Sequence, residues 1–434
     1  MKTLDKAKQV AMLAMMRAIL LRERIETGVS WNPIDRRFYD NPYPLYRRLR
    51  EKDPIHHSRL EDLWVLTRYE DIDAVLRDPR FSADDRNVKG YEANRRKMIA
   101  AGLIEGRDEV PSMLRMDPPD HTRLRSLVSK AFTPRAIESL RPRVEELVGG
   151  MLDEAEARGE LDIVKDLGVP LPIIVIAELL GIPAEDREHF KRWSDGVARG
   201  LNANTNEQVR IAGAASKELL EYLEPIARQR RAQPREDLLS SLLAAEESGD
   251  KLSMDEVFAT VTLLLVAGNE TTTNLIGNGM LALLQHPSEL RRLHDHPELI
   301  DGAVEELLRY DSPVQATSRI VKEELEFAGH KMNRGAQVIL HLGAANRDPA
   351  QFPDPNLLDI GRAENRHLAF SHGLHFCLGA PLARLEGQVA IGQLAARFPA
   401  MRRRPIDLEW TDNIILHGIK SLPVKLGGEA EPRP

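Results

Sequence analysis

The sequence predicts a mainly α-helical protein with a small β region, built as one large domain. Residues from about 120 to 310 follow mostly helical periodicity and charge spacing, whereas short strand-forming runs lie near residues 63–67 and 319–342. No internal repeat, low-complexity linker or abrupt change in composition divides the 434 residues. These observations favour a single mixed domain over the several domains that a length prior of roughly 150 residues per domain suggests.

Composition excludes several classes of protein. With 42% apolar and 29% charged residues, the chain can bury a large core, which excludes disordered and fibrous classes. The formal net charge of −7 makes a nucleic-acid partner unexpected. Cys377 is the single cysteine, so no intrachain disulfide, cysteine-rich zinc site or iron–sulfur cluster can form. A reducing cytoplasmic location is therefore expected.

Residues 1–28 are predicted to form a basic, methionine-rich helical extension before the main domain at 29–426 and a tail at 427–434. Five apolar residues recur at helical spacing and should share one face: Met12, Met15, Met16, Ile19 and Leu20. We expect this helix to pack on the body or to fray, with a membrane-surface or partner helix as the alternative. Its apolar run is short and interrupted by Arg17, so no transmembrane anchor or signal peptide is predicted.

Two helix starts are marked by their local sequence. Asp117-Pro118-Pro119-Asp120 breaks the chain, and Asp120 is a plausible N-cap for a helix that carries His121 and Arg125 on one face. Ser253-Met254-Asp255-Glu256 is a capping box that opens the longest apolar segment, which ends at His286-Pro287. A helix of roughly 30 residues is about 45 Å long, enough to cross the domain. We therefore expect it to be central and buried.

The C-terminal third changes pattern. Asn333-Arg334-Gly335 is a predicted turn before a strand at 336–341, and residues 347–365 show little periodicity. Cys377 then lies in a glycine-containing loop directly before a helix-forming segment, where backbone N–H groups and the helix dipole can stabilise a thiolate. A lone cysteine is more often a small buried apolar residue, and a nucleophile paired with His372 or His375 is a further alternative.

The residues around Cys377 carry a resemblance to a known family. The pattern Phe370, Gly373, His375, Cys377, Gly379 and Ala383-Arg384 resembles the haem-binding loop of the cytochrome P450 family, the haem-thiolate monooxygenases. The resemblance extends over residues from about 31 to 425. It implies the cytochrome P450 fold, with haem b buried between the long central helix and the cysteine loop, and Cys377 as the axial ligand of the haem iron. It also implies further haem contacts from Phe370, Gly379 and Ala267, and propionate partners at His121, Arg125, Arg319 and His375.

A second motif lies inside the long apolar segment, at Ala267-Gly268-Asn269-Glu270-Thr271-Thr272. Glycine and threonine weaken a helix locally, and an acid in an apolar stretch needs a reason. Taken alone, the motif fits equally well an exposed Glu270 with hydroxyls bonded back to helix carbonyls. It resembles the acid–alcohol pair of the family, which implies that Glu270 relays protons and that Thr271 forms hydrogen bonds beside the oxygen site.

A third motif, Glu306-Leu307-Leu308-Arg309, places an acid and a base on one helix face. By itself it would be a surface ion pair of small value. The resemblance instead implies a buried structural lock that Arg362 completes, with a role in folding around haem and none in the chemistry.

The resemblance implies a hydroxylase of a hydrophobic small molecule such as a fatty acid, terpenoid, steroid or macrolide-like compound. O₂ would be activated with two electrons from an external ferredoxin or flavodoxin, because the chain ends soon after Leu426 and leaves no room for a fused reductase. Candidate docking charges for that partner are Arg123, Lys130 and Arg366. By analogy the substrate pocket is expected to include Leu263, Val266, Ala267, Gln315, Ala316, Thr317, Ile414 and Ile415.

Two alternatives to this function remain open. One is a peroxide-driven peroxygenase on the same fold, and the other is a haem-binding sensor or carrier without turnover. The acid–alcohol pair argues against the second alternative, because simple binding needs no proton relay. No G-x-G-x-x-G, G-x-x-x-x-G-K-[ST] or H-E-x-x-H motif occurs, so nicotinamide, flavin, nucleotide-triphosphate and zincin functions lack their motifs.

Overall fold

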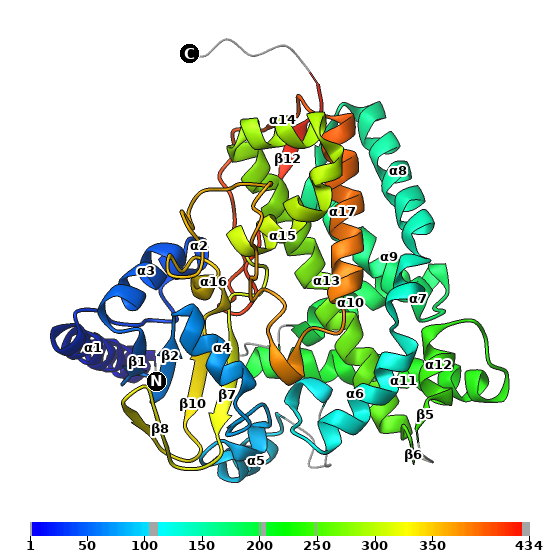
Figure 1. Cartoon of the computed structure of the whole chain (residues 1–434). Helices are drawn as coiled ribbons and strands as arrows, with labels where there is room; N and C mark the ends of the chain where they lie inside the picture. Colours follow the sequence, from blue (N-terminus) through cyan, green and yellow to red (C-terminus); the bar gives the residue numbers. More distant parts are fainter. Residues whose placement is uncertain (1, 104–111, 199, 201–204, 248–249, 428–434) are drawn as a thin grey trace.

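The computed structural model describes residues 2–103, 112–198, 200, 205–247 and 250–427. Most of the predicted tail at 427–434 lies outside this range. Figure 1 shows two regions: helices α8, α13, α14, α15 and α17 gather in the upper part, and a sheet with α1 beside it occupies the lower left. The predicted mainly helical fold with a small β region is confirmed.

The helices follow one another along the whole chain. Their bounds are α1 (Lys2–Thr27), α2 (Arg36–Asp40), α3 (Tyr43–Lys52), α4 (Tyr69–Arg77), α5 (Tyr91–Ala100), α6 (Asp120–Ala131), α7 (Pro134–Glu138), α8 (Arg141–Arg158), α9 (Pro170–Leu179), α10 (Arg187–Ala198), α11 (Asn206–Ala232), α12 (Leu238–Ala244), α13 (Met254–Gln285), α14 (Pro287–Asp295), α15 (Ile300–Tyr310), α16 (Leu342–Ala345) and α17 (Ala380–Arg397).

Helix α13 is the predicted central helix, and its capping box is confirmed. The Ser253 hydroxyl accepts a hydrogen bond from the Glu256 backbone N–H at 3.2 Å, and Glu256 Oε2 accepts one from the Ser253 N–H at 2.8 Å. Its 32 residues span about 48 Å and pack against α9, α10, α15 and α17. A Cβ at Gly387 of α17 would lie 2.9 Å from Leu275 of α13, so the missing side chain lets these two helices approach closely.

The main sheet has five strands in the order β1-β2-β10-β7-β3. Only the β2–β10 pair is parallel, and it joins strands from opposite ends of the chain, with Leu66 beside Leu340. Both strands were expected from local sequence, but their pairing was not. The strand bounds are β1 (Ile55–Ser58), β2 (Leu63–Leu66), β3 (Phe81–Ser82), β7 (Thr317–Val321) and β10 (Gln337–Leu340). Smaller sheets contain β4 (Glu160–Asp162), β5 (Glu246–Glu247), β6 (Asp250–Lys251), β8 (Leu325–Phe327), β9 (His330–Met332), β11 (Arg402–Arg403) and β12 (Pro423–Lys425).

The start of α6 differs from the prediction by one residue. Helix α6 begins at Asp120, and Pro119 occupies the N-cap position without a side-chain capping bond. Asp120 therefore contributes a negative charge to the first turn, where the helix dipole favours it, and does not cap the helix. The His121 N–H instead donates to the Asp117 carbonyl at 3.0 Å.

Helix α1 packs on the sheet through part of the face that apolar spacing indicated. Met16, Ile19 and Leu20 are half-buried as expected, whereas Met12 and Met15 are exposed. The same side of α1 carries Glu23, which is buried and whose Oε1 lies 3.1 Å from His56 Nε2 of β1. The periodicity of apolar residues does not reveal this buried contact between α1 and the sheet.

Candidate haem-binding site

The Cys377 loop is a tight structure at the N-terminus of α17. The Cys377 N–H donates to the Phe370 carbonyl at 2.9 Å, and the N–H groups of Gly379 and Ala380 donate to Cys377 Sγ. Burial raises the pKa of the thiol, while these two N–H groups and the positive charges of Arg125 and Arg384 oppose the rise. The loop therefore offers a sulfur whose negative charge is stabilised only by fixed donors and cations.

Cys377 is exposed, yet the protein atoms around its thiol are the main cause of its raised pKa. Ala267 is also exposed, although most of its neighbours on the central helix α13 are buried. The cysteine loop and the middle of α13 thus each leave one small side chain open to a ligand.

Two contacts hold the loop in place from outside. Gly373 has a φ of +69°, and a Cβ there would lie 2.6 Å from the carbonyl oxygen of Leu76 in α4, so only glycine fits. Arg384 lies over the Phe370 ring at 4.6 Å and forms two hydrogen bonds of 2.7 and 2.8 Å with Glu305. Burial would raise the pKa of Glu305, but bonds from Arg384 and His367 lower it to about 2. Phe370 is therefore clamped between the loop and a fixed arginine.

The four predicted propionate partners gather beside the loop. The rings of His121 and His375 are 4.2 Å apart, and Arg125 Nη2 donates to the Phe376 carbonyl at 2.7 Å. Burial, Arg319 and His121 lower the pKa of His375 to about 3. Burial and Arg115 lower the pKa of buried Arg319 to about 10. Both pKa values are lowered because basic groups lie close together and away from water.

Asp117 is the acid whose charge acts on this cluster, and its carboxylate already accepts hydrogen bonds from Ser82 and the Ala83 N–H and pairs with Lys322. Both ring nitrogens of His121 are buried without a hydrogen-bond partner. Arg319 forms no ion pair with any residue that the structure describes, and its guanidinium instead donates to the Ser318 carbonyl at 2.7 Å. Buried donors of this kind require an acidic ligand. A flat molecule with two carboxylates and a metal that accepts a thiolate fits these residues, which is the chemistry of haem.

The acid–alcohol pair lies in the middle of α13. Thr271 Oγ1 donates to the Ala267 carbonyl at 2.5 Å, which is the back-bonding that the sequence alone allowed, and Glu270 is half-buried. The preceding Asn269 is buried, and its Nδ2 donates to Ser194 Oγ of α10 at 3.1 Å. The sequence did not indicate this contact, because nothing near Ser194 marks it as a partner.

Glu306, Arg309 and Arg362 form one buried network. Arg309 donates to both oxygens of Glu306 at 2.7 and 2.8 Å, and Arg362 Nε donates to Glu306 Oε2 at 3.1 Å. Asp359 N–H and Asn365 Nδ2 also donate to the same carboxylate. Arg309 also donates to the carbonyls of residues 346, 355 and 357, and the last two lie in the stretch without periodicity that precedes the cysteine loop. The network thus ties α15 to that irregular segment.

The predicted substrate pocket divides into two groups. Leu263 is half-buried, Val266 and Ala316 are buried and Ala267 is exposed, while Thr317 and Ile415 are half-buried. Gln315 instead donates through Nε2 to the Tyr43 hydroxyl at 3.2 Å and to the Ser312 carbonyl at 2.8 Å. Ile414 packs against the cluster of Phe38, Tyr46 and Ala344. The side chains of Gln315 and Ile414 thus contact a different part of the molecule, around α3.

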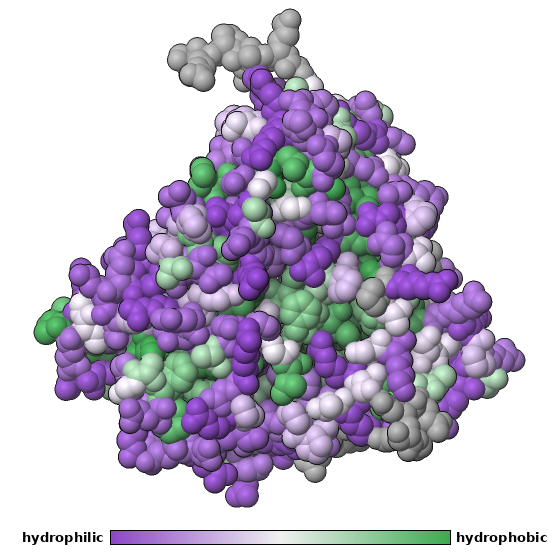
Figure 2. All heavy atoms as spheres, viewed as in Figure 1, coloured by the Kyte–Doolittle hydropathy of each residue, from purple (hydrophilic) through white to green (hydrophobic). Residues whose placement is uncertain are grey.

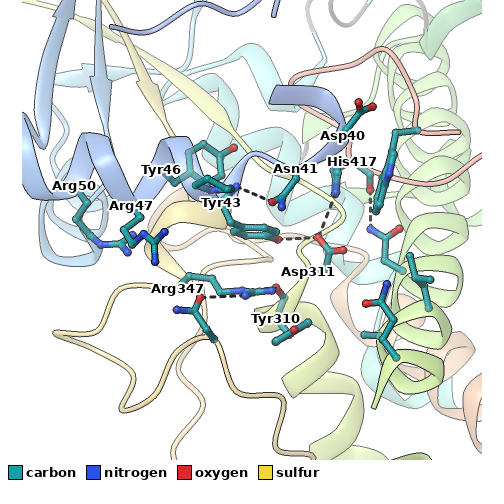
Figure 3. Close-up of a pocket in the computed structure, with 17 residues that line it drawn as sticks. Asp40, Asn41, Tyr43, Tyr46, Arg47, Arg50, Tyr310, Asp311, Arg347 and His417 are labelled. Atoms are coloured by element: carbon teal, nitrogen blue, oxygen red, sulfur yellow. Dashed lines mark hydrogen bonds and ion pairs between the residues drawn. The ribbon is translucent and has the colours of Figure 1, made fainter. Parts of the chain in front are cut away.

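That part of the molecule holds a separate polar cavity of about 350 Å³ (Figure 3). The Tyr43 hydroxyl donates to Asp311 Oδ1 at 2.8 Å, and His417 Nε2 lies 3.6 Å from the same oxygen. The guanidinium of Arg347 lies between the rings of Tyr43 and Tyr310, at 4.2 and 3.8 Å from their centres. Burial and Asp311 raise the pKa of Tyr43. Because Gln315 donates to the Tyr43 hydroxyl, its side chain belongs to the packing around this cavity.

The predicted docking charges differ in their surroundings. Arg123 forms an ion pair with Glu256 at the start of α13, whereas Lys130 and Arg366 are exposed. Leu374, on the cysteine loop itself, is also exposed. No group of three or more histidine, cysteine or acidic side chains among the described residues is arranged to hold a metal ion.

A cysteine loop with two N–H groups on the sulfur, a long central helix and a cluster of buried basic side chains are the features of a haem-thiolate protein. The family model for cytochrome P450 matches residues 56–405 of this chain. The chain belongs to the cytochrome P450 family. It is therefore an oxidoreductase of the monooxygenase type that uses haem b, O₂ and a hydrophobic substrate.

Several characterised bacterial proteins are similar along nearly the whole chain. The polyketide biosynthesis cytochrome P450 PksS of Bacillus subtilis (strain 168) is 43% identical over 407 residues, which are 92% of this chain and 99% of PksS. Its solved structure has a TM-score of 0.84, with the same 92% of this chain covered and 100% of that one. The vitamin D(3) 25-hydroxylase of Pseudonocardia autotrophica is 43% identical over 396 residues, covering 90% of this chain and 95% of the hydroxylase. The structure of P450BioI in complex with hexadec-9Z-enoic acid ligated acyl carrier protein is 36% identical, with a TM-score of 0.82, and covers 90% of this chain and 99% of that one.

Proposed function

We propose that this chain hydroxylates a hydrophobic small molecule with a long apolar chain or ring system, such as a fatty acid, terpenoid, steroid or macrolide-like compound. The observation that carries the proposal is exposed Cys377, whose Sγ accepts hydrogen bonds from two backbone N–H groups at the start of α17. The names of the vitamin D(3) hydroxylase and of the P450BioI complex support apolar substrates of this size. We assign residues 29–426 to the haem domain and 1–28 to an extension, in line with the 92% of this chain that PksS matches.

We assign separate residues to the haem iron, to the sulfur ligand and to the haem propionates. Cys377 holds the haem iron, and the N–H groups of Gly379 and Ala380 stabilise the charge on its sulfur. The bound haem supplies the chemistry of O₂ activation, so the protein has to bind, orient and deliver protons. The propionates are held by His121, Arg125, Arg319 and His375, with Phe370, Gly379 and Ala267 as further haem contacts.

Proton delivery falls to Glu270 and Thr271. Hydroxylation of a C–H bond consumes one O₂, two electrons and two protons, and it yields one hydroxyl group and one water. Thr271 Oγ1 donates to the Ala267 carbonyl, which leaves its lone pairs to accept a hydrogen bond from water, and half-buried Glu270 exchanges protons between that water and solvent. Leu263, Val266, Ala316, Thr317 and Ile415 provide the apolar wall that orients the substrate. Electrons come from a separate ferredoxin or flavodoxin, for which exposed Lys130, Arg366 and Leu374 are the contact candidates.

The visible spectrum of the reduced protein with carbon monoxide tests the haem assignment. We expect a strongly red-shifted Soret band that the Cys377→Ser variant loses, because the shift requires a thiolate ligand. Turnover with a surrogate ferredoxin and its reductase tests the roles of Glu270 and Thr271 in proton delivery. Thr271→Ala should keep the spectrum of the wild type, but the ratio of hydrogen peroxide to hydroxylated product should rise by roughly tenfold or more.

Three results would contradict the proposal. A red-shifted band that survives in Cys377→Ser would exclude the ligand assignment. Equal product yield per electron in Thr271→Ala, with efficient turnover from hydrogen peroxide alone, would establish a peroxygenase. Binding of many apolar ligands without oxidation of any, under conditions in which the surrogate partner reduces the haem, would establish a sensor or carrier.

A further inference from the structure

Helix α1 presents an apolar face away from the rest of the molecule. Residues spaced three, four and seven apart share one side of a helix, and on this side the residues between 11 and 25 are all exposed. We call it the outer face of α1, and it consists of Ala11, Ala14, Met15, Ala18, Leu21, Arg22 and Ile25. Met15 is 67% exposed, Leu21 59% and Ile25 75%. Figure 2 shows hydrophobic colour at its left edge, over α1.

This exposure is concentrated on one element. Twelve large apolar side chains are exposed among the described residues, and five of them belong to α1: Met12, Leu13, Met15, Leu21 and Ile25. The other seven are spread over the rest of the molecule, which is ordinary for a protein surface. A row of apolar side chains on one helix is different, because such patches mark surfaces that contact another molecule or a membrane.

The outer face points outward for a structural reason. Glu23, on the opposite side of α1, is 1% exposed and accepts a hydrogen bond from the Arg59 backbone N–H at 3.0 Å. His56 lies 3.1 Å from Glu23 and 2.8 Å from Asp53, so both sides of its ring meet a carboxylate. Rotating α1 to hide its outer face would pull Glu23 out of this arrangement and leave His56 with a single partner.

Positive charge borders the outer face. Arg17 and Arg24 lie along one edge, Arg22 lies within the face, and Glu26 lies along the other edge; all four are exposed. Arg22 pairs with Glu26, while Arg17 and Arg24 form no ion pair within the described parts of the chain. Arg24 also lines a second cavity of about 550 Å³ together with Arg48 and the Arg37–Asp35 ion pair. Residues 1–28 carry six basic and three acidic side chains in a chain of net charge −7, so the positive charge is local to this end.

A second copy of α1 is the alternative occupant of this face. In an antiparallel helix pair like edges meet, so Arg17 and Arg24 would face the same arginines of the partner, which is destabilising. In a parallel pair that edge would face the edge with Glu26, which already pairs with Arg22 of its own helix. An anionic lipid surface instead satisfies both the apolar row and its arginines. No helix in the described residues is long and apolar enough to span a bilayer, so the contact would be peripheral.

We propose that the outer face of α1 docks this protein onto an anionic lipid surface. Met15, Leu21 and Ile25 enter the boundary between headgroups and acyl chains, and Arg17 and Arg24 contact lipid phosphates. Docking places the protein on the phase in which hydrophobic small molecules concentrate. The inference rests on α1 alone and does not depend on the reaction at Cys377.

Sedimentation of the full-length haem protein with vesicles tests this inference. We expect binding to vesicles of equal parts phosphatidylcholine and phosphatidylglycerol, little binding to pure phosphatidylcholine, and release at high salt because exposed charges are screened. The variants Leu21→Glu/Ile25→Glu and Arg17→Glu/Arg24→Glu should each lose about tenfold or more in partitioning. The matched control is Leu220→Glu/Ile406→Glu, which alters two exposed apolar residues elsewhere and should bind like the wild type. Circular dichroism and the carbon monoxide spectrum verify that each variant is folded and holds haem.

The opposite results are equally clear. Wild-type protein that stays in the supernatant, that binds pure phosphatidylcholine as well as the anionic mixture, or that binds equally after both α1 substitutions would overturn the proposal. Light scattering identifies the other occupant: a wild-type dimer that Leu21→Glu/Ile25→Glu converts to a monomer, without vesicle binding by either, would assign the outer face to a second copy of this chain.

Discussion

Asn269 connects two helices at the point where α13 presents Glu270 and Thr271. Its Nδ2 donates to Ser194 Oγ of α10 at 3.1 Å, and Ser194 Oγ lies 3.4 Å from the Leu265 carbonyl that it donates to. Both side chains are buried, and Asn269 Oδ1 has no hydrogen-bond partner. A buried amide is costly unless it is bonded, so a partly satisfied one at this place indicates that the link positions the helix turn.

Removing this link should uncouple oxygen consumption from product formation. A hydrogen bond worth about 1 kcal/mol corresponds to a roughly fivefold change in the population of the aligned turn. We expect Asn269→Ala and Ser194→Ala each to lower the product formed per electron pair consumed severalfold, and the double variant to be no worse than either, because they remove the same contact. Asn278→Ala, which removes a bond to the His417 carbonyl further along α13, is the control and should lower stability only. Additive losses in the double variant would contradict a shared contact.

At the scale of an element, α1 is joined to β1 by one titratable side chain. His56 is fully buried between Asp53 and Glu23. Burial would lower the pKa of His56, but the two carboxylates outweigh it and raise the pKa from 6.5 to about 9. A histidine whose pKa is higher in the folded state stabilises that state most at low pH. The contribution is complete below pH 6.5 and disappears as the pH rises through about 9.

The junction between α1 and β1 should therefore weaken in mildly alkaline solution. The free energy of unfolding is expected to fall by on the order of 2 kcal/mol between pH 6.5 and pH 10, less any compensation from relaxation of α1. His56→Gln should be less stable at neutral pH and should lack this dependence. His57→Gln, at a neighbouring and more exposed residue, should retain it. Chemical denaturation at several pH values measures the difference, and parallel pH profiles for all three proteins would refute the assignment.

Local signals in the sequence predicted individual helices and strands better than the contacts between them. The capping box at Ser253 and the strands near residues 63 and 336 were predictable because their causes are local. The parallel pairing of β2 with β10 and the contact of Glu23 with His56 depend on residues far away in the chain, so periodicity could not supply them. In the site, the cysteine loop was indicated by its resemblance to a family, whereas Ser194 carries no signal at all.

At the scale of the whole molecule, a protein of net charge −7 gathers basic side chains in its interior. Arg319 is 5% exposed and without an ion pair among the residues described; Arg115 adds to the positive potential around it, and Asp117 offsets part of that potential. A buried charge without a partner lowers the free energy of unfolding. When a ligand brings carboxylates to that charge, the charge raises the free energy of unfolding instead. The same arginine should therefore destabilise the protein without haem and stabilise the protein with it.

Arg319→Leu should separate these two effects. We expect the haem-free variant to be more stable than haem-free wild type by on the order of 2 kcal/mol, because an unpaired buried charge is replaced by an apolar side chain of similar reach. The haem-bound variant should be less stable than haem-bound wild type, and transfer of its haem to an excess of apomyoglobin should be faster. Thermal melting of both forms of both proteins gives the four values needed. Arg158→Leu, which removes an exposed arginine paired with Asp166, is the control and should shift both forms by less than about 0.5 kcal/mol. If Arg319→Leu moves the two forms in the same direction by the same amount, the arginine only packs the fold and the buried basic side chains do not couple haem binding to folding.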